Sequence, residues 1–131
     1  MKLFVLTAVL LFAQAKTTQD GVYAAAQATR GEAVYGDKCS SCHAPDLTGD
    51  GQAPSLTGKD FQTGWNDQSL ADLFERIKAT MPADSPGSLK PAEITDVIAF
   101  ILKKDSMPAG ETELPADPST LKAIKLVAPK P

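Results

Sequence analysis

The side chains of this sequence best suited to bind a soft metal or a cofactor all lie in one pentapeptide, Cys39-Ser40-Ser41-Cys42-His43. It holds both cysteines of the chain and its only histidine. Two thiols and an imidazole at this spacing could form a redox-active disulfide, bind a metal ion, or add covalently to a cofactor. Each chemistry needs a different structural context, so the surrounding sequence decides among them.

The context of the pentapeptide favours covalent haem attachment. A thioredoxin-like site places its first cysteine at a helix start inside a strand–helix–strand unit, whereas here a helical pattern precedes Cys39 and strand patterns are missing. A structural zinc site needs four ligands, and the cysteines and histidine together number three. In the third interpretation both thiols add to haem vinyl groups and the adjacent histidine binds the iron. We therefore predict one haem c, attached through Cys39 and Cys42, with His43 as an iron ligand.

The second axial position of this iron is open to methionine, lysine, water or no ligand, because the chain has no second histidine. Beyond the N-terminal segment the methionines are Met81 and Met107, and each precedes a proline. Met81 falls between two predicted amphipathic helices, where a chain closing over the opposite haem face would present it. We predict Met81 as the ligand, with Met107 and an open position as the alternatives.

A helix and a loop are predicted on either side of the pentapeptide. Residues 24–38 are alanine-rich, contain no proline and repeat apolar positions at helical spacing, so a helix is expected to lead into Cys39. Residues 44–68 are rich in glycine, proline and small polar residues, which is typical of a long irregular loop. A loop of this length in a small domain usually wraps a ligand or a site.

Two amphipathic helices are predicted downstream. Ser69 can cap the first of them, with Asp72 three residues later, and the helix should end before Met81-Pro82. Pro91 suits the first turn of the second helix, which should end at Lys103-Lys104. The remaining tail carries several prolines and a weak apolar pattern, and no convincing strand is found.

The N-terminus has the form of an export signal. A basic start is followed by about 11 mostly apolar residues and by Ala13-Gln14-Ala15, a small-x-small cleavage site. The apolar run is shorter than the ~20 residues that a spanning helix needs. We expect cleavage of residues 1–15, a periplasmic location and no membrane span afterwards.

Composition limits the domain number and the partners. The chain has 131 residues, 43% hydrophobic and 22% charged, as expected for one small globular domain. Loss of Lys2 with the signal leaves 12 basic and 16 acidic residues, a formal charge of −4, so nucleic acid is excluded as a partner. The expected parts are a signal peptide (1–15), a lead-in (16–23), a cytochrome domain (24–107) and a Pro-rich C-terminal extension (108–131).

Most aromatic side chains are expected to pack around the haem. Trp65 is the exception, because its indole N–H needs a partner when it is buried, and a haem propionate could supply one. The acidic residues of the 44–68 segment are expected to be solvated.

The order of these motifs resembles that of class I c-type cytochromes with a single haem. The resemblance rests on Cys-x-x-Cys-His near the N-terminus, Pro-Ser-Leu at 54–56, Met81-Pro82 and a final apolar helix. It implies an all-α fold of about three to four helices around one covalently bound haem. It also implies that Gly31 and Tyr35 meet the helix that carries Phe100, and that the Pro54 carbonyl accepts a hydrogen bond from His43.

A narrower resemblance links the chain to small bacterial cytochromes and to cytochrome domains associated with quinoprotein dehydrogenases. It rests on the sequences TMPADSPGSL and PAGETELPAD. The expected function is single-electron transfer between periplasmic redox partners, among them a quinoprotein dehydrogenase and a terminal oxidase, without catalysis by the chain itself. One alternative is a cytochrome subunit dedicated to a quinoprotein-type dehydrogenase, with the 108–131 tail binding the catalytic subunit. A haem enzyme such as a peroxidase is disfavoured, since Met81 is available to occupy the second axial position of the iron.

Overall fold

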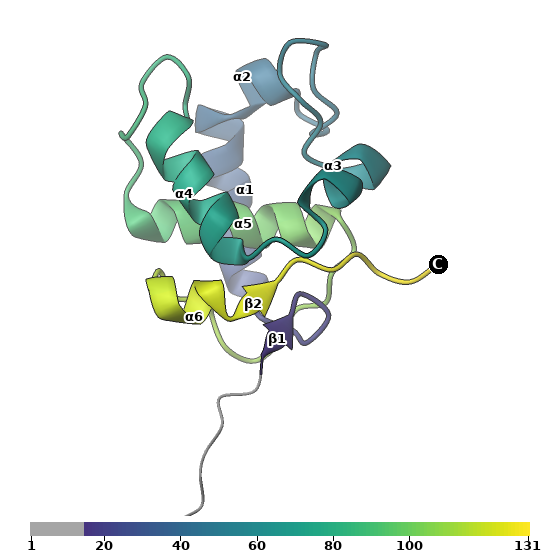
Figure 1. Cartoon of the computed structure of the whole chain (residues 1–131). Coiled ribbons are helices and arrows are strands. Elements are labelled where there is room, and N and C mark those ends of the chain that lie inside the picture. Colours follow the sequence, from purple (N-terminus) through teal and green to yellow (C-terminus); the bar gives the residue numbers. More distant parts are fainter. Residues whose placement is uncertain (1–14) are drawn as a thin grey trace, which may run out of the picture.

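The computed structural model describes residues 15–131, and most of its regular structure is helical (Figure 1). Except for Ala15, the predicted export signal lies outside the described residues. Within the described part, no helix is long and apolar enough to cross a membrane. The helices are α1 (Ala25–Lys38), α2 (Ser40–His43), α3 (Gly58–Trp65), α4 (Leu70–Thr80), α5 (Pro91–Lys104) and α6 (Pro118–Lys122), and the strands are β1 (Lys16–Thr17) and β2 (Ile124–Lys125).

The three long predicted helices are confirmed as α1, α4 and α5. Ser69 and Asp72 cap α4 reciprocally, since each side chain accepts a hydrogen bond of 3.1 Å from the other residue's backbone N–H. Helix α5 begins at Pro91 after Lys90, whose side chain cannot accept a hydrogen bond from the helix backbone. The Glu93 carboxylate instead accepts from the Lys90 backbone N–H at 2.9 Å, so one half of a capping box remains.

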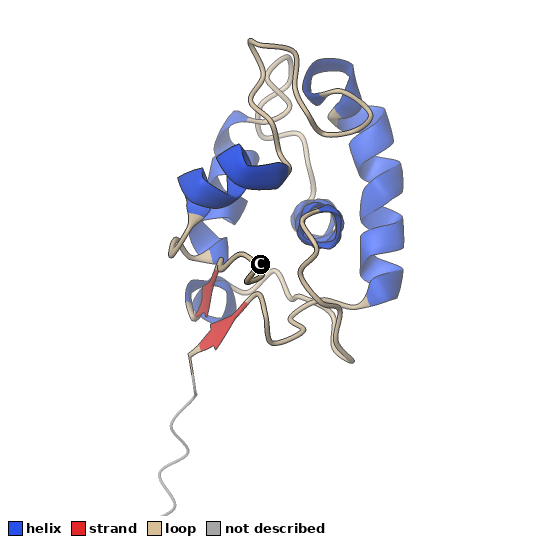
Figure 2. Ribbon diagram, turned by 90° about the vertical axis from the view of Figure 1, so that its right-hand side faces the viewer, coloured by secondary structure: helices blue, strands red, loops and turns tan. Residues whose placement is uncertain are grey.

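Helices α1 and α5 cross in close contact, and this crossing organises the core. Figure 2 looks along α5, with α1 upright beside it. A Cβ atom on Gly31 would lie 1.8 Å from the backbone oxygen of Asp96, so only glycine permits this approach. The rings of Tyr35 and Phe100 pack beside it with centroids 5.3 Å apart. The predicted contact of these residues is therefore confirmed.

The prediction of a continuous irregular loop over 44–68 is wrong for Gly58–Trp65, which form α3. Glycines near both ends of this segment disguised the helix, although Phe61 and Trp65 lie one turn apart on it and pack against the core. The strand pair was also missed, because two-residue strands leave no periodic pattern in a sequence. The all-α class is confirmed for the described residues, and the helices beyond the predicted three to four are short.

Asp105 joins the end of α5 to the start of α3. It is 2% exposed, and its Oδ1 accepts hydrogen bonds from the Gly58 backbone N–H (2.8 Å) and the Gln62 amide (3.2 Å). The carboxylate thus caps α3 from another helix, since Thr57 at the N-cap makes no side-chain cap bond. The other carboxylate oxygen, Oδ2, is buried and has no hydrogen-bond partner among the described residues. Burial raises the pKa of Asp105 to about 6, although its hydrogen bonds act to lower it.

This raised pKa predicts a loss of stability as the pH increases. Between about pH 4 and 6 the folded chain keeps the Asp105 proton while the unfolded chain releases it, so the free energy of unfolding falls as pH rises through this window. Asp105 lowers the free energy of unfolding by at most about 3 kcal/mol across this window, since each unit of pKa difference is worth about 1.4 kcal/mol. Denaturant unfolding between pH 4 and 7.5 should show a smaller fall in the free energy of unfolding for Asp105→Asn than for the wild type. Asp60→Asn, an exposed change on α3, should keep the wild-type pH profile, and parallel profiles for all three proteins would contradict the assignment.

Candidate functional site

The two cysteines lie on one short helical turn directly after α1. Cys39 ends α1, and its carbonyl accepts hydrogen bonds from the backbone N–H groups of Cys42 (3.2 Å) and His43 (3.0 Å). Residues three positions apart on a helical turn share a face. Both thiols are free, with Cys39 half-buried and Cys42 exposed. The turn therefore presents two unpaired sulfurs beside one imidazole.

The state of the Cys39 thiol argues against a thioredoxin-like site. Burial raises the pKa of Cys39 to about 11, so the thiol is protonated at neutral pH. Redox-active cysteines of Cys-x-x-Cys sites have lowered pKa values, because the thiolate is the attacking species. A zinc site is also unsupported, since the described residues contain no group of three or more Cys, His, Asp or Glu side chains that could hold a metal ion.

His43 is buried and its ring is fixed by one backbone contact. The Nδ1 atom lies 2.9 Å from the carbonyl oxygen of Pro54, and because a carbonyl can only accept, Nδ1 carries the proton. The other ring nitrogen, Nε2, is then left with its lone pair free to bind a metal. The contact between His43 and Pro54 that the family resemblance implied is therefore confirmed. Partners of this kind orient a ligating histidine and raise its basicity.

The loop after α2 folds back to bring Pro54 to His43. The Gly49 N–H donates to the His43 carbonyl (2.9 Å), and the Leu56 N–H donates to the carbonyl of buried Leu47 (2.8 Å). Gly49 has φ +78, and a Cβ there would lie 2.3 Å from the Ala53 oxygen. The Asp50 carboxylate accepts from the backbone N–H groups of Gln52 and Ala53, which lowers the pKa of Asp50. Exposed Asp50 thus holds a turn of this segment as well as facing solvent.

Ala44, directly after His43, has a backbone conformation that favours glycine, with φ 68 and ψ 153. The Tyr35 hydroxyl donates to its carbonyl at 2.6 Å and stabilises this turn. Burial raises the pKa of Tyr35 to about 12, and the nearby Cys39 and Asp46 add to the effect. The phenol therefore remains a proton donor at neutral pH. Tyr35 links the helix crossing to the cysteine turn, a role that helical periodicity alone did not reveal.

The two candidate methionines lie in different surroundings. Met81 is half-buried at the C-terminal end of α4, which lies with α2 at the upper end of the molecule in Figure 1. Met107 is 2% exposed and belongs to the buried core. Its carbonyl accepts a 2.7 Å hydrogen bond from the hydroxyl of buried Tyr23. The structure thus places Cys39, Cys42 and His43 on one turn and Met81 on a separate element.

An open pocket of about 480 Å³ lies between the Pro54 loop, α3 and α4. Phe61 and Trp65 contribute its aromatic wall, and Pro54 connects it to the His43 contact. Arg76 and Gln68 add exposed hydrogen-bond donors beside Trp65. Sequence reasoning singled out Trp65 and missed Arg76, whose only signal was its place beside the apolar face of α4.

The mostly helical fold is compatible with a c-type cytochrome domain, and the Cys-x-x-Cys-His turn has the spacing of a haem c attachment site. Residues 26–101 match the model of a protein family described as cytochrome c oxidase, cbb3-type, subunit III. Because the match covers more than half of the sequence, the chain belongs to this family. A search of curated proteins and a search of solved structures found no significant match. Membership makes the chain an electron-transfer haem protein, of a kind that is generally a carrier and not a catalyst.

Proposed function

We propose that this protein is a periplasmic electron carrier whose single haem c is attached through Cys39 and Cys42 and ligated by His43 and Met81. The observation that carries the proposal is the His43–Pro54 hydrogen bond, which leaves Nε2 free beside two unpaired thiols. When bound, the haem supplies one-electron exchange between ferric and ferrous iron. The periplasmic location follows from the export signal predicted at residues 1–15.

The residues around the pocket suit such a group. Leu56, Phe61 and Trp65 supply apolar wall, which excludes water from a porphyrin face. The Arg76 guanidinium and the Trp65 indole N–H can donate to the two propionates. The chain therefore offers thiols, an oriented imidazole, apolar surface and a cationic edge in neighbouring elements.

Met81 is the better second ligand because its side chain is only partly buried, whereas that of Met107 is buried in the core. Met81 ends α4 and is half-buried at the edge of the core. Met107 already fills the core beside Tyr23, so its use as a ligand would empty that position. When His43 and Met81 occupy both axial positions, the iron exchanges electrons and has no free position for a small substrate. This favours an electron carrier over a peroxidase.

A redox titration of the purified haem protein tests this function. We expect one reversible one-electron transition, no peroxidase activity and slow cyanide binding to the ferric protein. Rapid cyanide binding together with peroxide turnover would instead identify an open iron and a haem enzyme. Copurification of a large dehydrogenase subunit with the native protein would support the dedicated-subunit alternative.

A further inference from the structure

Two segments outside the matched region 26–101 pack against each other, and we call residues 16–24 and 108–127 together the clasp. Strands β1 and β2 pair in parallel, and the Thr18 hydroxyl donates to the Val127 carbonyl (2.8 Å) while accepting from the Val127 N–H (2.9 Å). The Gly110 N–H donates to the Tyr23 carbonyl at 2.7 Å. A Cβ on Gly110 would lie 1.9 Å from the Gly21 oxygen, so the two backbones touch. The lead-in and the extension therefore form one unit.

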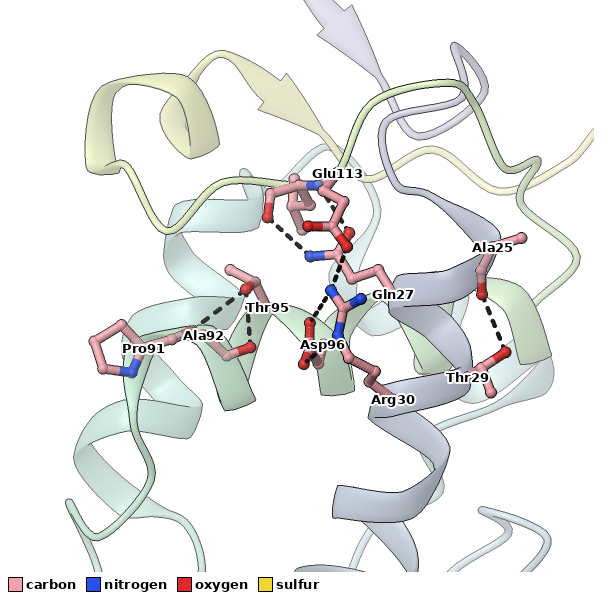
Figure 3. Close-up of polar contacts among 10 residues, drawn as sticks. Ala25, Gln27, Thr29, Arg30, Pro91, Ala92, Thr95, Asp96 and Glu113 are labelled. Atoms are coloured by element: carbon pink, nitrogen blue, oxygen red, sulfur yellow. Dashed lines mark hydrogen bonds and ion pairs between the residues drawn. The ribbon is translucent and has the colours of Figure 1, made fainter.

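Polar contacts fix the clasp to α1. The buried Gln27 side chain pairs with the backbone of Leu114, donating to its carbonyl (2.9 Å) and accepting from its N–H (2.8 Å). One turn later, Arg30 lies between Asp96 of α5 and Glu113 of the clasp (Figure 3). These contacts anchor the extension to the α1–α5 crossing.

The other end of the clasp is bonded to the two residues that lead into α4. The Asp67 N–H donates to the Leu126 carbonyl (2.9 Å), and the Leu126 N–H donates to the Gln68 carbonyl (2.8 Å). Leu121 and Leu126 are each 1% exposed. Helix α4 packs on α5, α6 and β2, and the last two belong to the clasp. Of the elements that the structure describes, α5 alone would remain as a packing partner of α4 without the clasp.

We propose that the clasp is a positioning device for α4, which fixes residues 67 and 68 directly before this helix and thereby holds Met81 at its other end. The inference rests on the proposed role of Met81 as a haem ligand. A single helical segment, Leu70–Thr80, joins these fixed residues to Met81, so loosening its start frees its end. The leucines of the tail and Ile124 are buried within this chain, so they are not exposed to a partner protein.

Truncation of the haem-loaded protein tests the clasp. A chain that ends at Ala123 loses β2 and the two backbone bonds to residues 67 and 68, whereas a matched chain that ends at Val127 keeps them. Cyanide binding to the ferric protein measures how often the Met81 position opens. We expect binding about tenfold faster in the shorter chain, the equivalent of about 1.4 kcal/mol, and a lower reduction potential. The chain that ends at Val127 should match the wild type in both measurements.

Two substitutions separate positioning from general destabilisation. Thr18→Val keeps the side-chain shape but removes both bonds to Val127, so it should speed cyanide binding in the same direction even if the truncated chain does not fold. Ala33→Gly, on the exposed face of α1, lowers helix stability without touching the clasp and should leave the rate unchanged. Equal rates for Thr18→Val and the wild type would overturn the clasp proposal. Met81→Leu, described below, tests the ligand separately, so the two proposals can fail independently.

Discussion

A chain with Cys39→Ser and Cys42→Ser is expected to carry no covalently bound haem. The sequence contains no other thiol, and a serine hydroxyl does not form the thioether. The single variant Cys42→Ser should retain at most one thioether through Cys39. Haem staining after denaturing electrophoresis, together with the mass of the intact protein, measures both outcomes.

Ser40→Ala with Ser41→Ala provides the matched control, because these changes lie on the same turn and leave both thiols in place. This control should retain haem through denaturation. We also expect the double cysteine variant to lose cooperative unfolding, since a small domain that wraps a cofactor depends on it for part of its core. Haem that survives denaturation in the double cysteine variant would contradict covalent attachment through these residues.

The sequence was sufficient to predict the helices that have periodic apolar positions or a recognisable capping residue. Helices α4 and α5 have apolar stripes and recognisable start signals, the N-cap Ser69 and the first-turn Pro91, and both were located to within a residue or two. The contact of His43 with Pro54 could be predicted from the family resemblance, because the order of the motifs identifies the Pro54 carbonyl as the partner of the histidine. Elements that are marked by a local pattern with a physical cause could therefore be predicted from the sequence.

The features that were missed depend on residues distant in sequence. Helix α3 obtains its cap from Asp105, 47 positions away from Gly58, so no local signal marks its start. The apolar residues of the tail gave a weak pattern because buried Leu121 and Ile124 lie on two different short elements, α6 and β2, which both pack on α4. The clasp likewise depends on backbone pairing between the two ends of the chain. Such contacts become visible once the topology is known.

Met81 and Met107 can be distinguished by replacing each with leucine, which keeps apolar volume and removes the thioether sulfur. Volume-conserving changes of this kind usually cost less than about 1.5 kcal/mol of stability. Met81→Leu should abolish the methionine-to-ferric charge-transfer band and open the iron to cyanide. It should also lower the reduction potential by a substantial part of the roughly 0.8 V that axial ligands span.

Met107→Leu is the matched control and should change none of these properties. Its side chain lies in the core at 2% exposure, and its carbonyl bond to Tyr23 does not depend on the side chain. Met107→Ala should lower stability by about 2–5 kcal/mol through the cavity it leaves, again with the charge-transfer band intact. If the band persists in Met81→Leu and disappears in Met107→Leu, the ligand is Met107 and the packing of α5 must differ from that described here. If the wild type lacks this band and both variants keep the wild-type spectrum and potential, neither methionine binds the iron.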